Sequence, residues 1–327
     1  MTIKDIAEHF GISISMVSRA INNSGYIRED LRREIVEYAR LHHWQPSKRA
    51  VSLKTGSSHS VGVVVPYINT NQFEFIPMLI SRLSHLNYSW QFVLGGTPEQ
   101  IDALTAYPVE MILAINITDA QIGAVYNAMK KNIPVLNIFG RRDEIPSILS
   151  PHKNAVYDCM KTLVEHGHRK IAYIGLDLSI NTPDLSTLHY SSALEGMKNA
   201  VKDFDLDFDI NRDCIFSQEY NFDSQAIKKL LTNGEYTAVF GWTVFAEIAF
   251  YTACRELGIT IGKDISFIGF EGNNTLQGFN PPPTYYEFDY NAMLDAVTRF
   301  VQNKGKNFPL FTETGFTLMP GESICKI

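Results

Sequence analysis

The chain has 327 residues, of which 45% are hydrophobic, and its formal net charge at pH 7 is −6. No apolar run approaches the ~18 residues of a membrane-spanning helix, and the amino-terminal residues lack the apolar stretch of a secretory signal peptide. The four cysteines have neither paired nor metal-ligand spacing. The sequence therefore predicts a globular cytoplasmic protein of two or three domains, with reduced cysteines, no membrane association, no metal and no cofactor.

Two short helices joined by a glycine turn are predicted at residues 3–10 and 14–22. Apolar residues recur at three- and four-residue spacing on one face of the first helix: Ile3, Ile6, Ala7 and Phe10. Thr2 and Asp5 have the spacing of a capping box, and Gly11 supplies the backbone freedom that the turn needs. This is the helix-turn-helix arrangement, in which the second helix enters the major groove of DNA.

The second helix is expected to be capped by Ser13 and to bury Val17, Ala20 and Ile21. The residues that remain on its outer face are Ile14, Ser15, Ser18, Arg19 and Asn22. Small side chains allow close approach to base edges, and an arginine can make a bidentate contact to guanine. A third helix is predicted at residues 29–42, with one apolar stripe: Leu31, Ile35, Tyr38 and Leu41.

A short basic segment follows the third helix. Pro46 ends that helix and Ser47 can cap a new one, but the stretch to Lys54 is too short to be a stable helix in isolation. Residues 1–54 hold nine Lys and Arg against six Asp and Glu, a net charge of +3, so that residues 55–327 carry −9. A basic head on an acidic body favours DNA binding by the head. The alternative is a solvated three-helix domain without a nucleic-acid role.

After a small polar linker at 55–59, apolar strand-like runs alternate with helical stretches. A first set of strands is predicted at 61–65, 91–94, 111–115 and 135–139, with a helix at 75–86, and a second set at 170–174, 214–216, 238–240 and 265–270. Apolar strands that alternate with helices indicate parallel sheets covered on both faces. The sequence thus predicts an all-α head and an α/β body of two Rossmann-like lobes, with a ligand cleft at the carboxyl ends of the strands.

The head resembles the LacI/GalR family of bacterial repressors. Residues 2–22, TIKDIAEHFGISISMVSRAIN, are similar to the family pattern T-I-K-D-V-A-x-x-A-G-V-S-x-x-T-V-S-R-V-L-N, except that Met16 replaces a threonine. The resemblance implies a hinge that becomes helical on DNA, with Leu53 as a wedge in the minor groove. The DNA-binding residues it implies are Ser13, Ile14, Ser15, Ser18, Arg19, Asn22, Lys48, Ala50, Leu53 and Lys54.

The body resembles the type I periplasmic-binding-protein fold that the same family uses as a sensor. Residues 163–175, LVEHGHRKIAYIG, and 262–270, GKDISFIGF, are similar to the family motifs H-L-x-x-L-G-H-R-x-I-A-x-I-G and G-x-D-I-S-V-I-G-F-D. The resemblance gives these domain bounds: a DNA-binding head at 1–46, a hinge and linker at 47–57, and an effector-binding and dimerisation domain at 58–327. Its N-lobe is expected at about 58–157 plus 289–315, and its C-lobe at about 158–288 plus the C-terminal segment.

The expected effector pocket departs from the family. Ala193 stands at the place of an arginine, Thr243 and Val244 replace an Asn-Asp pair beside Trp242, and Phe288 replaces a glutamine, whereas an acid is kept as Glu271. The pocket residues expected are Tyr67, Phe73, Asn154, Ala193, Phe222, Trp242, Thr243, Glu271 and Phe288. The aromatic residues either stack on a sugar or an aromatic or nucleoside-like effector, or are ordinary core residues.

The sequence as a whole favours a homodimeric transcriptional regulator, most simply a repressor of a carbohydrate or other catabolic operon, controlled by a small metabolite. Two heads on a two-fold axis imply a pseudo-palindromic double-stranded operator. Whether the effector is an inducer or a corepressor stays open. No P-loop or hydrolase motif points to an enzyme. A secreted solute-binding protein would explain the body but not the head.

Overall fold

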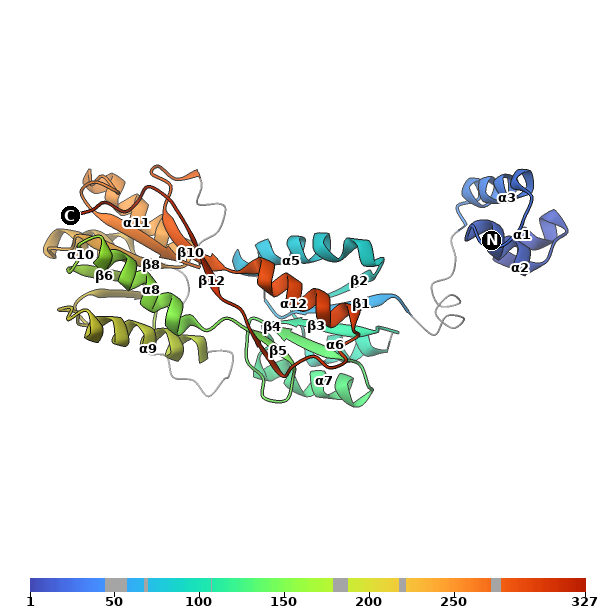
Figure 1. The fold of residues 1–327 in the computed structure, drawn as a ribbon, viewed down its shortest axis with the longest axis horizontal. Helices are drawn as coiled ribbons and strands as arrows, with labels where there is room; N and C mark the ends of the chain where they lie inside the picture. The colour runs from blue at the N-terminus through green and yellow to red at the C-terminus, as the bar shows by residue number, and fades with distance from the viewer. Residues whose placement is uncertain (45–57, 68–69, 107, 179–187, 218–221, 272–277) are drawn as a thin grey trace. The chain divides into compact units, whose positions relative to one another are not determined.

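The computed structural model of the chain describes residues 1–44, 58–67, 70–106, 108–178, 188–217, 222–271 and 278–327. The chain folds as two compact units, Met1–His59 and Ser60–Ile327, called here the head and the body (Figure 1). The head is helical, and the body consists of two α/β lobes. In the described residues, no helix is long and apolar enough to cross a membrane.

Three helices form the head: α1 (Ile3–Phe10), α2 (Ile14–Ile21) and α3 (Glu29–Leu41). The predicted capping box is confirmed, because Thr2 Oγ1 accepts from the Asp5 amide at 3.3 Å while the Thr2 amide donates to Asp5 Oδ2 at 2.7 Å. The hydrogen bond that the Asp5 carboxylate accepts from the Thr2 backbone amide lowers the pKa of Asp5. Gly11, with φ +62°, ends α1 in the left-handed conformation that glycine adopts without strain.

The head has a small core of its own. Ile6, Val17 and Ile35, one from each helix, are completely buried. The prediction that Leu41 belongs to this core is wrong, since Leu41 is 62% exposed. It is the last residue of α3, and Ala39, two residues earlier, takes the buried position instead.

The N-lobe is built on one parallel sheet. Its strand order is β11-β5-β4-β3-β1-β2. The strands are β1 (Ser60–Val65), β2 (Ser89–Leu94), β3 (Met111–Ile115), β4 (Val135–Ile138), β5 (Ser147–Leu149) and β11 (Phe311–Glu313). Helices α5 (Thr70–Leu83) and α12 (Tyr290–Gln302) cover one face, and α6 (Pro98–Thr105) and α7 (Asp119–Lys130) the other. Apolar strands such as β1, buried at every residue, suit a sheet that is covered on both sides.

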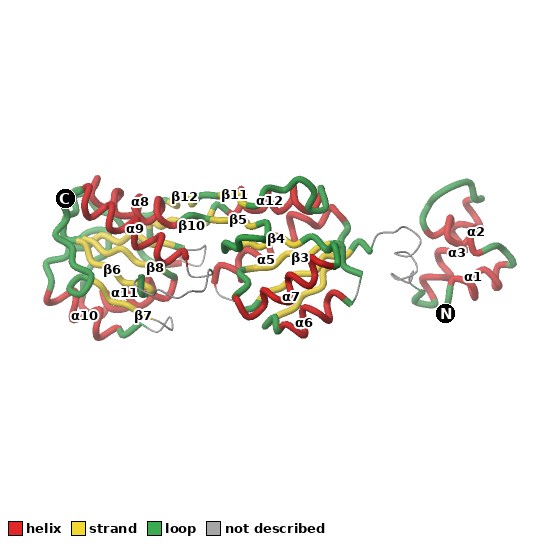
Figure 2. Tube along the Cα trace, turned by 90° about the horizontal axis from the view of Figure 1, so that it is seen from below, coloured by secondary structure: helices red, strands yellow, loops and turns green. Residues whose placement is uncertain are grey.

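The C-lobe repeats this architecture. Its sheet has the order β12-β10-β9-β8-β6-β7. The strands are β6 (Ile171–Leu176), β7 (Cys214–Ser217), β8 (Ala238–Trp242), β9 (Ser266–Phe270), β10 (Thr284–Phe288) and β12 (Phe316–Met319). Helices α8 (His152–Glu165) and α9 (Leu188–Asp203) pack on one face, and α10 (Ser224–Asn233) and α11 (Val244–Leu257) on the other. Figure 2 shows the strands of each lobe lying between its helices.

The chain passes between the lobes at residues 150–151, at Asp289 and at residues 314–315. Hydrogen bonds join these crossings to one another. The hydroxyl oxygens of Ser150 and Thr314 lie 2.9 Å apart, and the Asp289 amide donates to the Gly315 carbonyl at 3.0 Å. The crossings therefore form one hinge between the lobes, at the same edge of both sheets. This hinge between the lobes is different from the hinge predicted at 47–57.

The predicted fold class is confirmed, with two corrections of detail. The helix predicted at 75–86 begins a turn earlier, as α5, and its last turn is the 3₁₀ helix Ser84–Leu86. The C-lobe sheet is not wholly parallel, because β12 runs antiparallel to β10. Residues 316–319 enter the sheet directly from the last crossing, without a helix that would reverse their direction.

Candidate functional site

The outer face of α2 carries the side chains that were expected to read DNA. Ile14, Ser15, Arg19 and Asn22 are exposed, and Ser18 is half-buried. Ser13 Oγ caps the helix by accepting from the Met16 amide at 3.3 Å, and it lies 2.8 Å from Ser15 Oγ. Asn22 Nδ2 donates to the Ser18 carbonyl at 2.8 Å. The face thus combines small hydroxyl groups, one apolar side chain and one arginine.

Arg19 is the basic group of this face. No acid in the described part of the chain forms an ion pair with it, whereas three of the four arginines of α3 and its cap are paired: Arg28 with Asp30, Arg32 with Glu29, and Arg40 with Glu37. The Arg19 side chain passes over Gly25, where a Cβ would lie 3.2 Å from Arg19 Cδ. Arg19 therefore keeps all its donors available to a base or a phosphate.

The four expected hinge contacts, Lys48, Ala50, Leu53 and Lys54, lie outside the described residues. One exposed group of the head was missed from the sequence. Tyr26, in the loop between α2 and α3, is 92% exposed. This aromatic residue, five positions after the end of α2, could have been identified only from its exposure, which no local pattern reveals.

In the body, polar and strained residues collect where the strands end. Asn116, Phe139, Thr243 and Glu271 directly follow β3, β4, β8 and β9, and each has a positive φ, of 50°, 69°, 87° and 55°. Residues other than glycine are rarely found there, and such strain concentrates at binding sites. The carboxyl ends of parallel strands are where this kind of fold binds ligands. In the N-lobe, the Asn116 amide donates to the Tyr67 hydroxyl.

Glu271 is the centre of a polar network at the end of β9. Its Oε1 lies 2.7 Å from Nε2 of His152, the first residue of α8, and its Oε2 accepts from Nδ2 of Asn71 on α5 at 3.2 Å. His152 and Asn71 are 6% and 8% exposed. The carboxylate predicted from the sequence is therefore held by two residues that the sequence did not single out, one of them from the N-lobe.

Two of the five aromatic residues expected to line the pocket, Trp242 and Phe288, are buried. Trp242 is completely buried in the C-lobe core, with its ring centroid 5.2 Å from that of Phe270 and 5.6 Å from that of His152. Phe288 is 5% exposed and packs edge-to-face against Phe139 at 5.1 Å. In this conformation neither ring presents a surface on which a ligand could stack.

The remaining expected pocket residues do not form one group. Ala193 is buried in the C-lobe core, Thr243 caps α11 through a 3.4 Å hydrogen bond from the Ala246 amide, and half-buried Phe222 packs against the core between α10 and α11. Asn154 is exposed on α8, Phe73 is 76% exposed on α5, and Tyr67 is 43% exposed. Of these residues, Tyr67 and Thr243 lie directly at strand ends, as Glu271 does.

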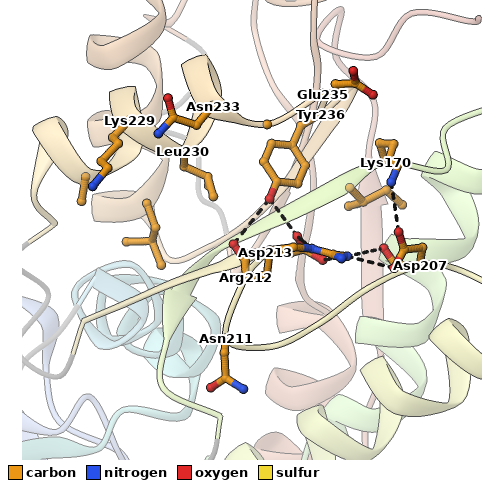
Figure 3. Close-up of a pocket in the computed structure, with 14 residues that line it drawn as sticks. Lys170, Asp207, Asn211, Arg212, Asp213, Lys229, Leu230, Asn233, Glu235 and Tyr236 are labelled. Carbon is orange, nitrogen blue, oxygen red and sulfur yellow. Dashed lines mark hydrogen bonds and ion pairs between the residues drawn. The ribbon is translucent and has the colours of Figure 1, made fainter.

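A separate hollow of about 590 Å³ lies at the amino-terminal edge of the C-lobe strands, around Lys170 and Asp213 (Figure 3). Arg212 bridges Asp207 at 3.0 Å and the buried Asp213 at 2.7 Å, and the Tyr236 hydroxyl donates to Asp213 at 2.8 Å. These hydrogen bonds lower the pKa of Asp213 against the effect of its burial, while burial raises the pKa of Tyr236 to about 12. The network satisfies its own charges and stabilises this end of the lobe.

Comparison with known proteins agrees with this geometry. The profile of bacterial regulatory proteins of the lacI family matches residues 2–47, and that of the periplasmic binding protein-like domain matches residues 160–323, half of the chain. The probable transcriptional repressor ExuR of Bacillus subtilis is 27% identical over 290 residues, which cover 86% of this chain and 84% of ExuR.

Two solved structures share the fold over 99% of both chains. The Lac repressor dimer bound to operator and the anti-inducer ONPF has a TM-score of 0.78 at 20% identity. The complex of the transcriptional regulator CelR with cellobiose has a TM-score of 0.65 at 18% identity. A helix-turn-helix head on a periplasmic-binding-protein-like body defines a DNA-binding transcriptional regulator of the repressor type, with a body that senses a small molecule. The chain belongs to the lacI family of bacterial regulatory proteins.

Proposed function

We propose that the effector of this regulator is a small polar metabolite, a sugar or a related compound, bound at the strand ends between the two lobes. The observation that carries this proposal is the set of positive-φ residues that follow β3, β4, β8 and β9. Asn116 and Glu271, one from each lobe, bring an amide and a carboxylate to this edge, and the half-exposed ring of Tyr67 adds an apolar surface. Hydroxyl-rich ligands need such a mixture of acceptors, donors and one flat face.

The alternative, an aromatic or nucleoside-like effector stacked between Trp242 and Phe288, needs both rings to become accessible. The burial of the two side chains in the lobe cores favours the polar ligand. The structure of CelR, one of the structural neighbours, is that of its complex with cellobiose. Asn154, Phe73 and Phe222 stay candidates for effector contact in two cases. Either the ligand is larger, or the two lobes are closed around it to a different extent.

The DNA-reading face is proposed to be the outer side of α2, with Arg19 as the base-reading group and Ser15, Ser18 and Asn22 as its polar neighbours. The hinge at 47–57 is proposed to contact the minor groove through Leu53. We propose that the protein works in the cytoplasm, because the chromosome of a bacterium lies there. We propose no catalytic role.

The protein is proposed to act as a homodimer, which matches two heads to a pseudo-palindromic operator. The body offers apolar surface for a second copy in both lobes. Phe92 and Leu94 on the edge strand β2 are 39% and 55% exposed, and Phe245 and Ile248, one turn apart on α11, are 44% and 43% exposed. An exposed apolar edge strand makes a monomer prone to aggregation, and pairing with a second copy in a dimer covers this edge.

A thermal-shift screen of carbohydrates, nucleosides and aromatic metabolites on the full chain tests the effector proposal. A saccharide is expected to raise the melting temperature of the wild type but not that of Glu271→Gln, because the carboxylate is the proposed anchor. Glu235→Gln, in the separate outer hollow, is the matched control and should respond as the wild type does. A compound that stabilises the wild type and Glu271→Gln equally would place the ligand elsewhere.

A further inference from the structure

The carboxylate at the end of β9 is already occupied by side chains of the protein itself. Glu271 Oε1 faces His152 Nε2 at 2.7 Å, and Oε2 accepts from Asn71 Nδ2 at 3.2 Å. Glu271 holds this orientation with φ +55°, a conformation that costs energy for a residue with a side chain. The two hydrogen bonds hold the side chain in this orientation.

The hydrogen bonds of His152 fix the orientation of its ring. Nδ1 lies 2.7 Å from the Ser150 carbonyl oxygen, which can only accept, so Nδ1 carries a hydrogen. Nε2 faces the Glu271 carboxyl group at 2.7 Å, so that the imidazole ring is held at both nitrogens, by the backbone on one side and by Glu271 on the other.

His152 lies at the hinge. It is the first residue after the crossing at 150–151, and its ring centroid lies 5.2 Å from that of Phe316, which follows the crossing at 314–315. It lies 6.0 Å from the ring centroid of Phe288, which precedes the crossing at Asp289. The residue that fixes Glu271 is thus packed among the segments about which the lobes move.

Asn71 approaches from the other lobe. It belongs to α5, whose Phe75 and Leu79 are buried in the N-lobe core, whereas Glu271 and His152 belong to the C-lobe. The hydrogen bond between Asn71 and Glu271 therefore joins the two lobes directly. It joins positions 200 residues apart in the sequence and is broken by any motion that separates the lobes at this point.

We propose that Asn71, Glu271 and His152 form a latch that holds the two lobes of the effector-free protein together. His152 fixes the carboxylate to the hinge, and Asn71 donates to its second oxygen from the other lobe. The latch itself needs no ligand. Only the second role of Glu271, as the anchor of the effector, rests on the proposed function. A ligand that donates a hydrogen bond to Oε2 takes the place of the Asn71 amide, so that binding replaces this direct contact between the lobes by contacts through the ligand.

The test measures the distance between the lobes in the full chain without any small molecule. Donor and acceptor dyes are attached through Glu99→Cys on α6 and Gln225→Cys on α10, both exposed, with half-buried Cys214 and Cys325 replaced by serine. These helices follow β2 and β7, the sheet edges farthest from the hinge, so that opening lengthens the distance. An excess of unlabelled protein restricts energy transfer to single chains.

Asn71→Ala is expected to shift the energy transfer toward longer distances. Asn71→Asp should shift it further, because two carboxylates then face each other. The swapped pair Asn71→Asp with Glu271→Gln restores an amide-to-carboxylate hydrogen bond and should return the wild-type distance. Asn127→Ala, an exposed asparagine on α7, is the control that should change nothing.

Wild-type energy transfer in both single variants of Asn71 would overturn the latch, as would a swapped pair that stays as open as Asn71→Asp. If Asn71→Ala does not give a cooperative melting transition, Asn71→Asp and the swapped pair decide the question. All of these measurements omit the effector. Their failure is therefore distinguishable from a failure of the effector assignment, which the response of Glu271→Gln in the ligand screen decides.

Discussion

Glu287, on β10 beside the hinge, should make the stability of the body depend on pH. Burial raises the pKa of this half-buried carboxyl from 4.5 to about 7, and the nearby charges of Glu74 and Asp289 add to the rise. One of its oxygens has no hydrogen-bond partner among the described residues. The folded protein therefore keeps a proton on Glu287 that the unfolded chain releases between pH 4.5 and 7.

The free energy of unfolding consequently falls as the pH rises through this window, and the loss is complete above pH 7. A rise of the pKa from 4.5 to about 7 corresponds to about 3 kcal/mol. Because the side chain is only half-buried, solvent screening reduces this value, and about 1–3 kcal/mol is expected. Glu287→Gln, which cannot ionise, should recover that amount at pH 8.5 and less than about 0.5 kcal/mol at pH 4.5.

Urea denaturation of the wild type and Glu287→Gln at the two pH values measures this difference. Glu313→Gln, an exposed residue of β11, is the control and should leave stability unchanged at both. An equal effect of Glu287→Gln at pH 4.5 and pH 8.5 would refute the reasoning, because it would mean that the carboxyl is not protonated by folding.

Three further predictions concern the packing of the body and one helix cap of the head. Gly196→Ala on α9 should destabilise the protein by about 2–4 kcal/mol, because the new Cβ would lie 2.1 Å from the Lys153 carbonyl oxygen. At Gly123 on α7 a new Cβ meets nothing within 4 Å, so Gly123→Ala should stabilise the protein by up to about 1 kcal/mol. The two variants should therefore shift the denaturation midpoint in opposite directions. Glu247→Met should raise the free energy of unfolding by about 1–3 kcal/mol. The reason is that burial raises the pKa of the Glu247 carboxyl, whose oxygens have no hydrogen-bond partner among the described residues. An unchanged or lower free energy of unfolding would show that the carboxyl group has hydrogen-bond partners in the folded protein. Ser13→Ala removes the cap of α2, so it should speed hydrogen exchange of the amides in the first turn of α2 and lower the free energy of unfolding by about 1 kcal/mol. Ser13→Asn keeps a capping side chain and should exchange as the wild type does. Equal exchange rates in the two variants would contradict the capping role.

The elements of this fold could be predicted where the pattern is local. The run at 111–115 is buried at each residue and is β3 as predicted, and the capping box of α1 follows from two side chains three residues apart. The antiparallel β12 could not be predicted in this way. Its direction depends on the crossing at 314–315, which joins residues of the two sheets rather than neighbours in the sequence.

The cleft was predicted only in part for the same reason. Glu271 was found because it directly follows a recognisable strand. His152 looked like any residue at a helix start, and Asn71 like any polar residue of an amphipathic helix. Their significance comes from meeting at one carboxylate, over separations of 119 and 200 residues. Trp242 was expected at the pocket wall, but the inward direction of its side chain at the end of β8 buries it instead.

Selection of bound duplexes from a random-sequence DNA library, with the full chain and with Arg19→Ala, tests most directly whether α2 reads base sequence. The wild type should enrich an inverted repeat with two equal half-sites. Arg19→Ala should bind that site about 1–3 kcal/mol more weakly and lose the preference at one base pair in each half-site. Enrichment of no common sequence by the wild type, or an Arg19→Ala variant that weakens binding to the selected site and to random DNA equally, would contradict the assignment of α2 as the base-reading helix.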